Sequence, residues 1–197
     1  TMVDGGKAPE GLDAESVTGV ETLIAVAKLL MAQRAKRGSL ELARGELRFD
    51  LDAEGEPTGA HTRESRFAER VVEVAMVLAN EVVGRRLLDA ELPVPWRVHD
   101  KPPGEGLERF LNFAATLGLT KRDQPTDPGS LSKMVERVVG KPLYPVLSLL
   151  LLRAMSRAEY KAECSPHWGL SSETYLHFTS PIRRYPDLLV HRAIRWS

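Results

Sequence analysis

The chain has 197 residues, of which 27 are basic and 27 acidic, so its formal net charge is zero and any polyanion site must come from local clustering of charge. A hydrophobic content of 43% is sufficient for a buried core, and the longest strongly apolar run, residues 147–152, is too short to cross a bilayer. The only cysteine, Cys164, rules out an internal disulfide framework, and the polar N-terminus has no apolar signal-peptide core. We therefore expect a cytoplasmic protein without a membrane partner.

The first predicted element follows a polar segment, residues 1–18, whose glycines and proline are typical of a flexible linker. Apolar side chains at helical spacing then predict a helix over residues 19–37, which Thr18 can cap and Gly38 can end. Alternating apolar residues over 39–51 predict a strand or a hairpin. The chain thus opens with a long helix followed by a small antiparallel element.

The rest of the chain is predicted to be mainly helical, with short extended segments and loops between the helices. In chain order we expect a turn over 52–59, a helix over 63–88, an extended piece over 96–99, a helix over 106–117, a loop over 123–129, helices over 131–139 and 142–163, and a loop over 165–172. Pro186 disfavours a helical conformation at Tyr185, so we expect a tight turn over 181–185 and a regular helix from about Pro186. The predicted fold class is α+β, helix-dominated, with a small antiparallel sheet.

That turn belongs to the segment HFTSPIRRYPDLLVHR, residues 177–192, which concentrates polar and cationic side chains. Adjacent arginines point to different sides, so at most one of Arg183 and Arg184 easily serves the fold, and the other is available for an anion. Thr179 and Ser180 add hydroxyls, and the helix start adds unpaired backbone N–H groups, a combination that suits a phosphate oxygen. The alternative interpretation is a capped helix with surface arginines.

A second unusual segment is VVEVAMVLAN, residues 71–80. It is almost wholly apolar, which is typical of a buried helix, yet Glu73 and Asn80 share one of its faces. A buried carboxylate is costly unless it is paired. Glu73 therefore either pairs with a structural arginine, such as Arg66 or Arg70, or belongs to the polar lining of a site.

A third segment, WRVHD, alternates along an extended stretch. Arg97 and His99 are expected on one side of it, and Trp96 and Val98 on the other. A solvated strand face explains this pattern as well as a contact with phosphate or sugar does.

The segment YLHFTSPIRRYPDLLVHR, residues 175–192, resembles the signature of the ribonuclease II/RNB family of exoribonucleases. Further segments are similar to other motifs of that family: RGSLELARGELRFDLD (37–52), VVEVAMVLANEVV (71–83), WRVHDKP (96–102), RAMSRAEY (153–160) and HWGL (167–170). The matches are collinear from about Leu23 to the C-terminus. The resemblance identifies residues 19–197 as the C-terminal part of an RNB-like catalytic domain.

The resemblance implies hydrolytic 3′→5′ degradation of single-stranded RNA with release of nucleoside 5′-monophosphates. It also implies Mg²⁺ held by a cluster of aspartates, where the metal activates water, and aromatic side chains that stack on bases. The implied partners are single-stranded RNA, the remainder of the catalytic domain and the flanking RNA-binding barrels of the family.

Carried onto this sequence, the arginine that contacts the phosphate near the scissile bond is Arg183, for which the resemblance implies a catalytic role. The residues expected to contact RNA or to shape its binding surface are Thr179, Ser180, Arg184, Tyr185, His177, Arg97, His99, Glu73 and Asn80. Of the two arginines, Arg183 is expected to neutralise phosphate charge and Arg184 to anchor the turn.

The sequence also departs from the family pattern. It has no spaced aspartate cluster, so the Mg²⁺ ligands are expected outside this chain, which is expected to be inactive alone. Val74 follows Glu73 where the family often has paired glutamates, and Leu42 stands where a base-stacking phenylalanine is common. Both differences favour an alternative, a catalytically lost RNB-like protein that binds RNA, whereas the presence of Arg183 favours an active enzyme.

Overall fold

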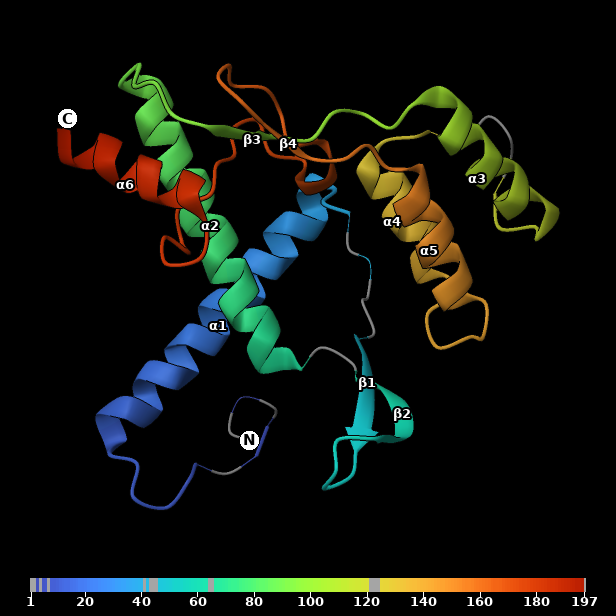
Figure 1. The fold of residues 1–197 in the computed structure, drawn as a ribbon, viewed down its shortest axis with the longest axis horizontal. Coiled ribbons are helices and arrows are strands. Elements are labelled where there is room, and N and C mark those ends of the chain that lie inside the picture. The colour runs from blue at the N-terminus through green and yellow to red at the C-terminus, as the bar shows by residue number, and fades with distance from the viewer. Residues whose placement is uncertain are drawn as a thin grey trace.

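The computed structural model describes residues 3, 5–6, 8–40, 42, 46–63, 66–120 and 125–196. The predicted segments 1–18, 39–51, 63–88 and 123–129 each lie partly outside the described residues. The elements in chain order are α1 (Ala14–Arg37), β1 (Glu46–Leu51), β2 (Pro57–Arg63), α2 (Phe67–Asp89), β3 (Trp96–Val98), α3 (Gly104–Thr116), α4 (Pro128–Glu136), α5 (Tyr144–Ala154), β4 (Glu159–Lys161), the 3-10 helix η2 (Trp168–Leu170) and α6 (Tyr185–Trp196). The predicted helix-dominated α+β class is confirmed (Figure 1).

Helix α1 starts earlier than predicted, because Asp13 rather than Thr18 caps it. The Asp13 carboxylate accepts the Ser16 backbone N–H at 2.8 Å and the Ser16 hydroxyl at 2.9 Å, and these bonds lower the pKa of Asp13. Thr18 lies inside the helix, where its hydroxyl donates to the carbonyl of Ala14. Gly38 ends the helix in the left-handed conformation, with a φ of 85°, as predicted.

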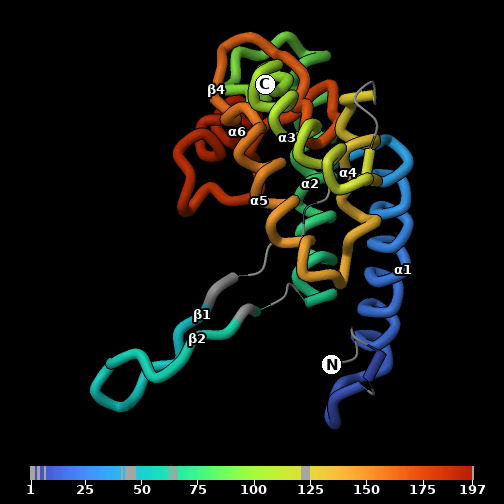
Figure 2. Tube along the Cα trace, turned by 90° about the vertical axis from the view of Figure 1, so that its right-hand side faces the viewer, coloured from blue at the N-terminus to red at the C-terminus, as the bar shows by residue number. Residues whose placement is uncertain are grey.

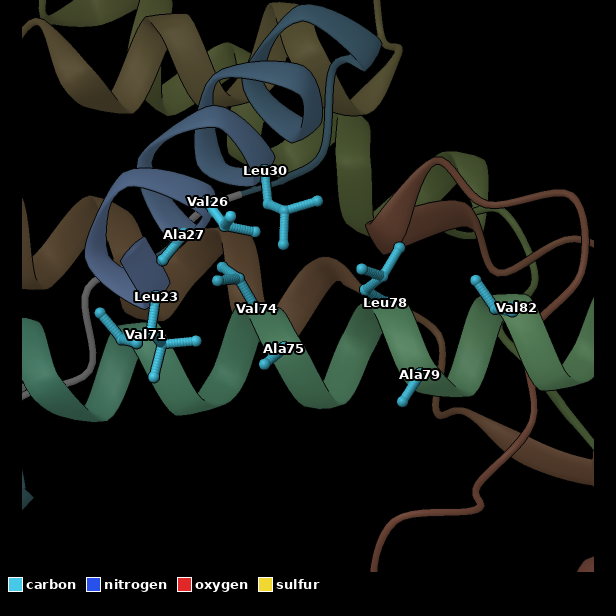
Figure 3. A pocket seen from close by; sticks show the side chains of 10 residues that line it. All are labelled: Leu23, Val26, Ala27, Leu30, Val71, Val74, Ala75, Leu78, Ala79 and Val82. Carbon is cyan, nitrogen blue, oxygen red and sulfur yellow. The ribbon is translucent and has the colours of Figure 1, made fainter. Parts of the chain in front are cut away.

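Helices α1 and α2 pack on one another through a small apolar contact (Figure 3). Ala27, Val71 and Val74 are buried there. Beside this contact, the two helices line a groove of about 270 Å³ whose walls are all apolar side chains, among them Leu23 and Leu78. A groove without polar groups offers nothing to a phosphate, so the candidate site lies elsewhere.

Strands β1 and β2 form an antiparallel hairpin in which Glu46 lies opposite Arg63. The Asp52 carboxylate closes the turn by accepting two backbone N–H groups, at 3.1 and 2.8 Å. The turn predicted over 52–59 is therefore shorter than expected, since β2 already begins at Pro57. Figure 2 shows the hairpin pointing away from the helical part of the molecule.

Helices α3, α4 and α5 surround the largest apolar core of the described chain. Its most completely buried side chains are Ala114, Leu131, Leu147 and Leu151. Helix α5 ends at Ala154, so the prediction of helix through residue 163 is wrong. Residues 159–161 form strand β4 instead, which pairs antiparallel with β3 and places Tyr160 opposite Arg97.

Strand β3 lies between helices α2 and α6 on one side and helices α3, α4 and α5 on the other (Figure 1). It confirms the predicted extended piece, and its Trp96 and Val98 side chains are buried. They belong to a core that also contains Leu176 and, from α6, Val190, which fixes the C-terminal segment to the rest of the molecule. Helix α6 starts at Tyr185, close to the predicted position. Among the helices that the structure describes, none is long and apolar enough to cross a membrane.

Candidate functional site

The turn before α6 is held by a buried carboxylate. Asp187 is fully buried, and its Oδ1 accepts the backbone N–H of Ser180 and the Arg184 guanidinium, both at 2.7 Å. The Ser180 carbonyl in turn accepts the backbone N–H groups of Arg183 and Arg184. Ser180 and Arg184 therefore stabilise the turn itself. A charge pair removed from water in this way fixes geometry more than it adds stability.

Arg183 has a different environment from its neighbour. Its side chain is exposed, and it makes no hydrogen bond or ion pair with any residue in the described ranges. On either side of this arginine pair, Ile182 is fully exposed and Tyr185 is 65% exposed. The turn thus presents one unpaired guanidinium to solvent on a rigid support.

Asn80 connects helix α2 to the same segment. It is buried, its amide donates to the Tyr175 hydroxyl at 3.0 Å, and its Oδ1 accepts the backbone N–H groups of Phe178 and Thr179 at 2.9 and 3.3 Å. These bonds account for a polar residue on an apolar helix. Asn80 and Thr179 thus lie together, with Asn80 holding the backbone that leads into the turn.

Glu73 is not brought to this turn by any contact in the described structure. Its side chain is 58% exposed and lies 3.6 Å from Arg34 of α1, whose guanidinium is buried. The expectation that Glu73 is buried is wrong, because the carboxylate pairs with Arg34 at the edge of the α1–α2 contact and keeps more than half of its side chain in solvent. The arginine partner also differs from the predicted Arg66 and Arg70.

The two polar residues of the WRVHD segment have separate environments. His99 is buried, its Nε2 lies 2.9 Å from the Ser156 carbonyl, and its Nδ1 accepts the Gly169 N–H at 3.1 Å. It joins β3 to the loop around η2 and has no open face for RNA. Arg97 remains partly exposed, and its guanidinium stacks 4.8 Å from the centre of the Tyr160 ring.

His177 lies close enough to Arg97 on one strand, and to Arg183 and Arg184 on the turn, to feel the charge of all three. Its Nδ1 is 2.7 Å from the Tyr160 hydroxyl. Burial, followed by the positive charges of Arg184 and Arg97, lowers the pKa of His177 from 6.5 to about 4, so the imidazole is neutral near pH 7. Sequence reasoning missed Tyr160, although the motif RAMSRAEY contains it, because a helix was predicted there.

The described residues do not fit the magnesium ion that the family implies. Within the described ranges, no group of three or more His, Cys, Asp or Glu is arranged to hold a metal. Near the turn, the Asp187 carboxylate is buried and paired with Arg184, and Arg97 and Arg183 add positive charge. Mg²⁺ prefers accessible anionic and neutral oxygen ligands, which this surface does not offer.

The fold and the turn define a domain of the RNB type. Residues 3–196 match the family model described as the RNB domain, so the chain belongs to this family, and the resemblance seen in the sequence is confirmed. The chain is 37% identical over 196 residues to Ribonuclease R 1 of Lactococcus lactis, which covers 98% of this chain and 24% of that protein. It is 38% identical over 174 residues to Ribonuclease R of Thermotoga maritima, which covers 87% of this chain and 24% of that protein.

A solved structure shares the fold. Mycoplasma genitalium RNase R, in complex with ribose-methylated single-stranded RNA, superposes with a TM-score of 0.86 at 29% identity, over 95% of this chain and 30% of that one. The chain thus spans about a quarter of the length of the curated relatives.

Proposed function

We propose that this chain forms the part of a cytoplasmic 3′→5′ exoribonuclease that grips single-stranded RNA, and that the enzyme hydrolyses it to nucleoside 5′-monophosphates. The observation that carries the proposal is the contrast between two adjacent arginines. Arg184 is tied to buried Asp187, whereas Arg183 is exposed and unpaired among the described residues. A guanidinium held ready on a rigid turn suits the oxygens of a phosphate.

The role proposed for Arg183 follows from its charge and its support. Charge on the phosphate oxygens increases as water attacks phosphorus, and a pre-positioned cation stabilises that charge without reorganising. The turn of Ser180, Arg184 and Asp187 supplies this positioning. Arg183 therefore contributes more to turnover than to the affinity for RNA.

Magnesium is part of the proposal, with its ligands outside this chain. Held by residues outside this chain, the metal would supply an activated water and would stabilise the leaving oxygen. The described residues bind and orient the strand. The isolated chain is accordingly expected to be inactive.

The alternative, a catalytically lost RNA-binding relative, was suggested by Val74 and Leu42. Both have packing roles in this fold. Val74 is buried between α1 and α2, and Leu42 packs against the core of α3 to α5. A carboxylate at residue 74 would point into an apolar contact and not toward the turn from Ser180 to Asp187 that carries Arg183 and Arg184, which we call the arginine turn. These two residues therefore give little support to the alternative.

A chimera tests the proposal. Residues 3–196 replace the matching segment of Lactococcus lactis Ribonuclease R 1, and the product is incubated with 5′-labelled single-stranded RNA and Mg²⁺. We expect a ladder that shortens from the 3′ end. Arg183→Ala in the chimera should lower kcat on the order of 100-fold and change the Kd for RNA by less than about fivefold.

Arg192→Ala is the matched control, because Arg192 is exposed on α6. This substitution should change neither kcat nor the Kd for RNA. Equal losses in kcat and affinity for Arg183→Ala would contradict the role proposed for this arginine. A chimera that binds RNA but does not shorten it, with Mg²⁺ and with Mn²⁺, would establish the non-catalytic alternative.

A further inference from the structure

Three side chains from separate segments meet beside the arginine turn, and we name them the Arg97–Tyr160–His177 cluster. Arg97 and Tyr160 are register partners on β3 and β4, with the guanidinium over the phenol ring at 4.8 Å. The Tyr160 hydroxyl lies 2.7 Å from His177 Nδ1, and the two rings meet edge to face with centroids 5.7 Å apart. Tyr160 is 41% exposed, so packing of the core does not explain the arrangement.

The charge of Arg97 fixes the direction of the hydrogen bond. A cation over the face of a phenol draws electron density from the ring, which makes the hydroxyl a better donor and a poorer acceptor. Tyr160 therefore donates, and His177 Nδ1 accepts. A neutral imidazole carries one N–H, so its proton resides on Nε2.

The Nε2–H group of His177 has no hydrogen-bond partner in the part of the chain that the structure describes. Burial is the largest cause of the lowered pKa of this imidazole, and three cations, Arg184, Arg97 and Arg183, lower it further. The carboxylate that opposes them, Asp187, is buried and paired with Arg184. A positive environment repels a metal ion and favours an anionic acceptor of the N–H, and on a nucleic-acid strand that acceptor is a phosphate oxygen.

We propose that Tyr160 is a positioning residue, which holds His177 in its Nε2–H form so that His177 donates a hydrogen bond to an RNA phosphate next to the one at Arg183. The identity of the ligand rests on the proposed function. The position of the proton does not, because it is a property of the protein without RNA.

The proton position is measured first, on the free chain, by NMR of ¹⁵N-labelled histidines. We expect His177 to be protonated on Nε2 alone, and Tyr160→Phe to produce a mixture of both neutral forms. His191, whose Nε2 lies 3.0 Å from the Phe178 carbonyl, is the internal control and should not change. A proton on Nδ1 in the unaltered chain, or no change of His177 in Tyr160→Phe, would overturn the assignment of Tyr160.

The contact with RNA is measured next, by titrating the chain and its variants with a labelled single-stranded oligonucleotide. His177→Phe removes the donor and should weaken binding roughly tenfold, and Tyr160→Phe roughly two- to fivefold. His177→Gln carries an amide N–H near the place of Nε2 that does not depend on Tyr160, so it should retain most of the affinity.

The decisive comparison is Tyr160→Phe in the His177→Gln background, where no further loss is expected. An equal loss in both backgrounds would show a merely structural role for Tyr160. If the unaltered chain fails to bind RNA while the chimera shortens it, the phosphate contact proposed for His177 is wrong and the proposed function stands. A chimera that neither binds nor shortens RNA would refute the proposed function, whereas the NMR result decides the role of Tyr160 in either case.

Discussion

Asp187 is the residue on which the geometry of the arginine turn depends. Both of its hydrogen bonds are made by Oδ1, and Oδ2 is buried without a partner among the described residues. A carboxylate in such a place persists only because Arg184 supplies the opposite charge. The exposed Arg183 thus depends on a side chain that contacts no ligand.

Replacing Asp187 with Asn should therefore destabilise the fold. The change keeps an oxygen acceptor but leaves the Arg184 guanidinium, with only 25% of its side chain exposed, without its counter-charge. We expect the free energy of unfolding, measured by urea titration, to fall by about 3 kcal/mol. Arg192→Ala on the same helix should change it by less than about 0.5 kcal/mol. A similar small change in Asp187→Asn would mean that the ion pair does not hold the turn.

His167 gives the fold a dependence on pH. Burial, and then the charge of neighbouring His99, lowers the pKa of His167 from 6.5 to about 3, and its Nδ1 has no partner among the described residues. Below pH 6.5 the unfolded chain gains a proton at this ring that the folded chain does not. The contribution of His167 to the free energy of unfolding is thus fully present above pH 6.5 and decreases as the pH falls toward 3.

The slope should approach 1.4 kcal/mol per pH unit for His167, with His177 adding a second contribution down to about pH 4. Urea titrations between pH 6.5 and 5 measure it, in a window where most carboxylates stay ionised. His167→Phe should reduce the slope by the amount that the binding of one proton contributes. An unchanged slope in this variant would show that His167 is protonated in the folded state.

At the scale of helices and strands, sequence patterns predicted those features that depend on interactions between residues close together in the chain. The left-handed Gly38, the extended segment at Trp96 and Val98, and the helix start after Pro181 all follow from short-range rules, and each is present. Strand β4 was missed because the preference of residues 159–161 for pairing with β3 depends on residues some 60 positions away.

The same limit applies to the candidate site. The sequence singled out Asn80 and the arginine turn because each breaks an apolar or helical pattern, and the structure brings Asn80 to the segment that leads into this turn. It misjudged Glu73, because the exposure of α2 is decided by its neighbours in space. Tyr160 carried no local signal of its contact with His177, which joins β4 to the segment before α6.

At the scale of the whole molecule, one of the places where the N-terminal and C-terminal halves meet lies at Gly38. The end of α1, the start of α4 and the 3-10 helix η2 come together around Gly38. The Ser171 hydroxyl donates to the Gly38 carbonyl at 2.9 Å, and Leu40 donates its N–H to the Gly169 carbonyl at 2.9 Å. Backbone approaches backbone here, which only residues without a side chain permit.

Gly129, in the first turn of α4, tests this junction. A Cβ added there would lie 2.9 Å from the Gly38 Cα, an atom of the backbone that cannot turn aside. We expect Gly129→Ala to lower the free energy of unfolding by about 1–3 kcal/mol. Gly19→Ala, inside α1 with no atom within 4 Å of the new Cβ, is the matched control and should raise it by about 0.5–1 kcal/mol through helix propensity alone. The two substitutions are chemically identical and should have opposite signs in the same urea titration. If both stabilise the chain, α1 and α4 are not held in contact at Gly38 and Gly129.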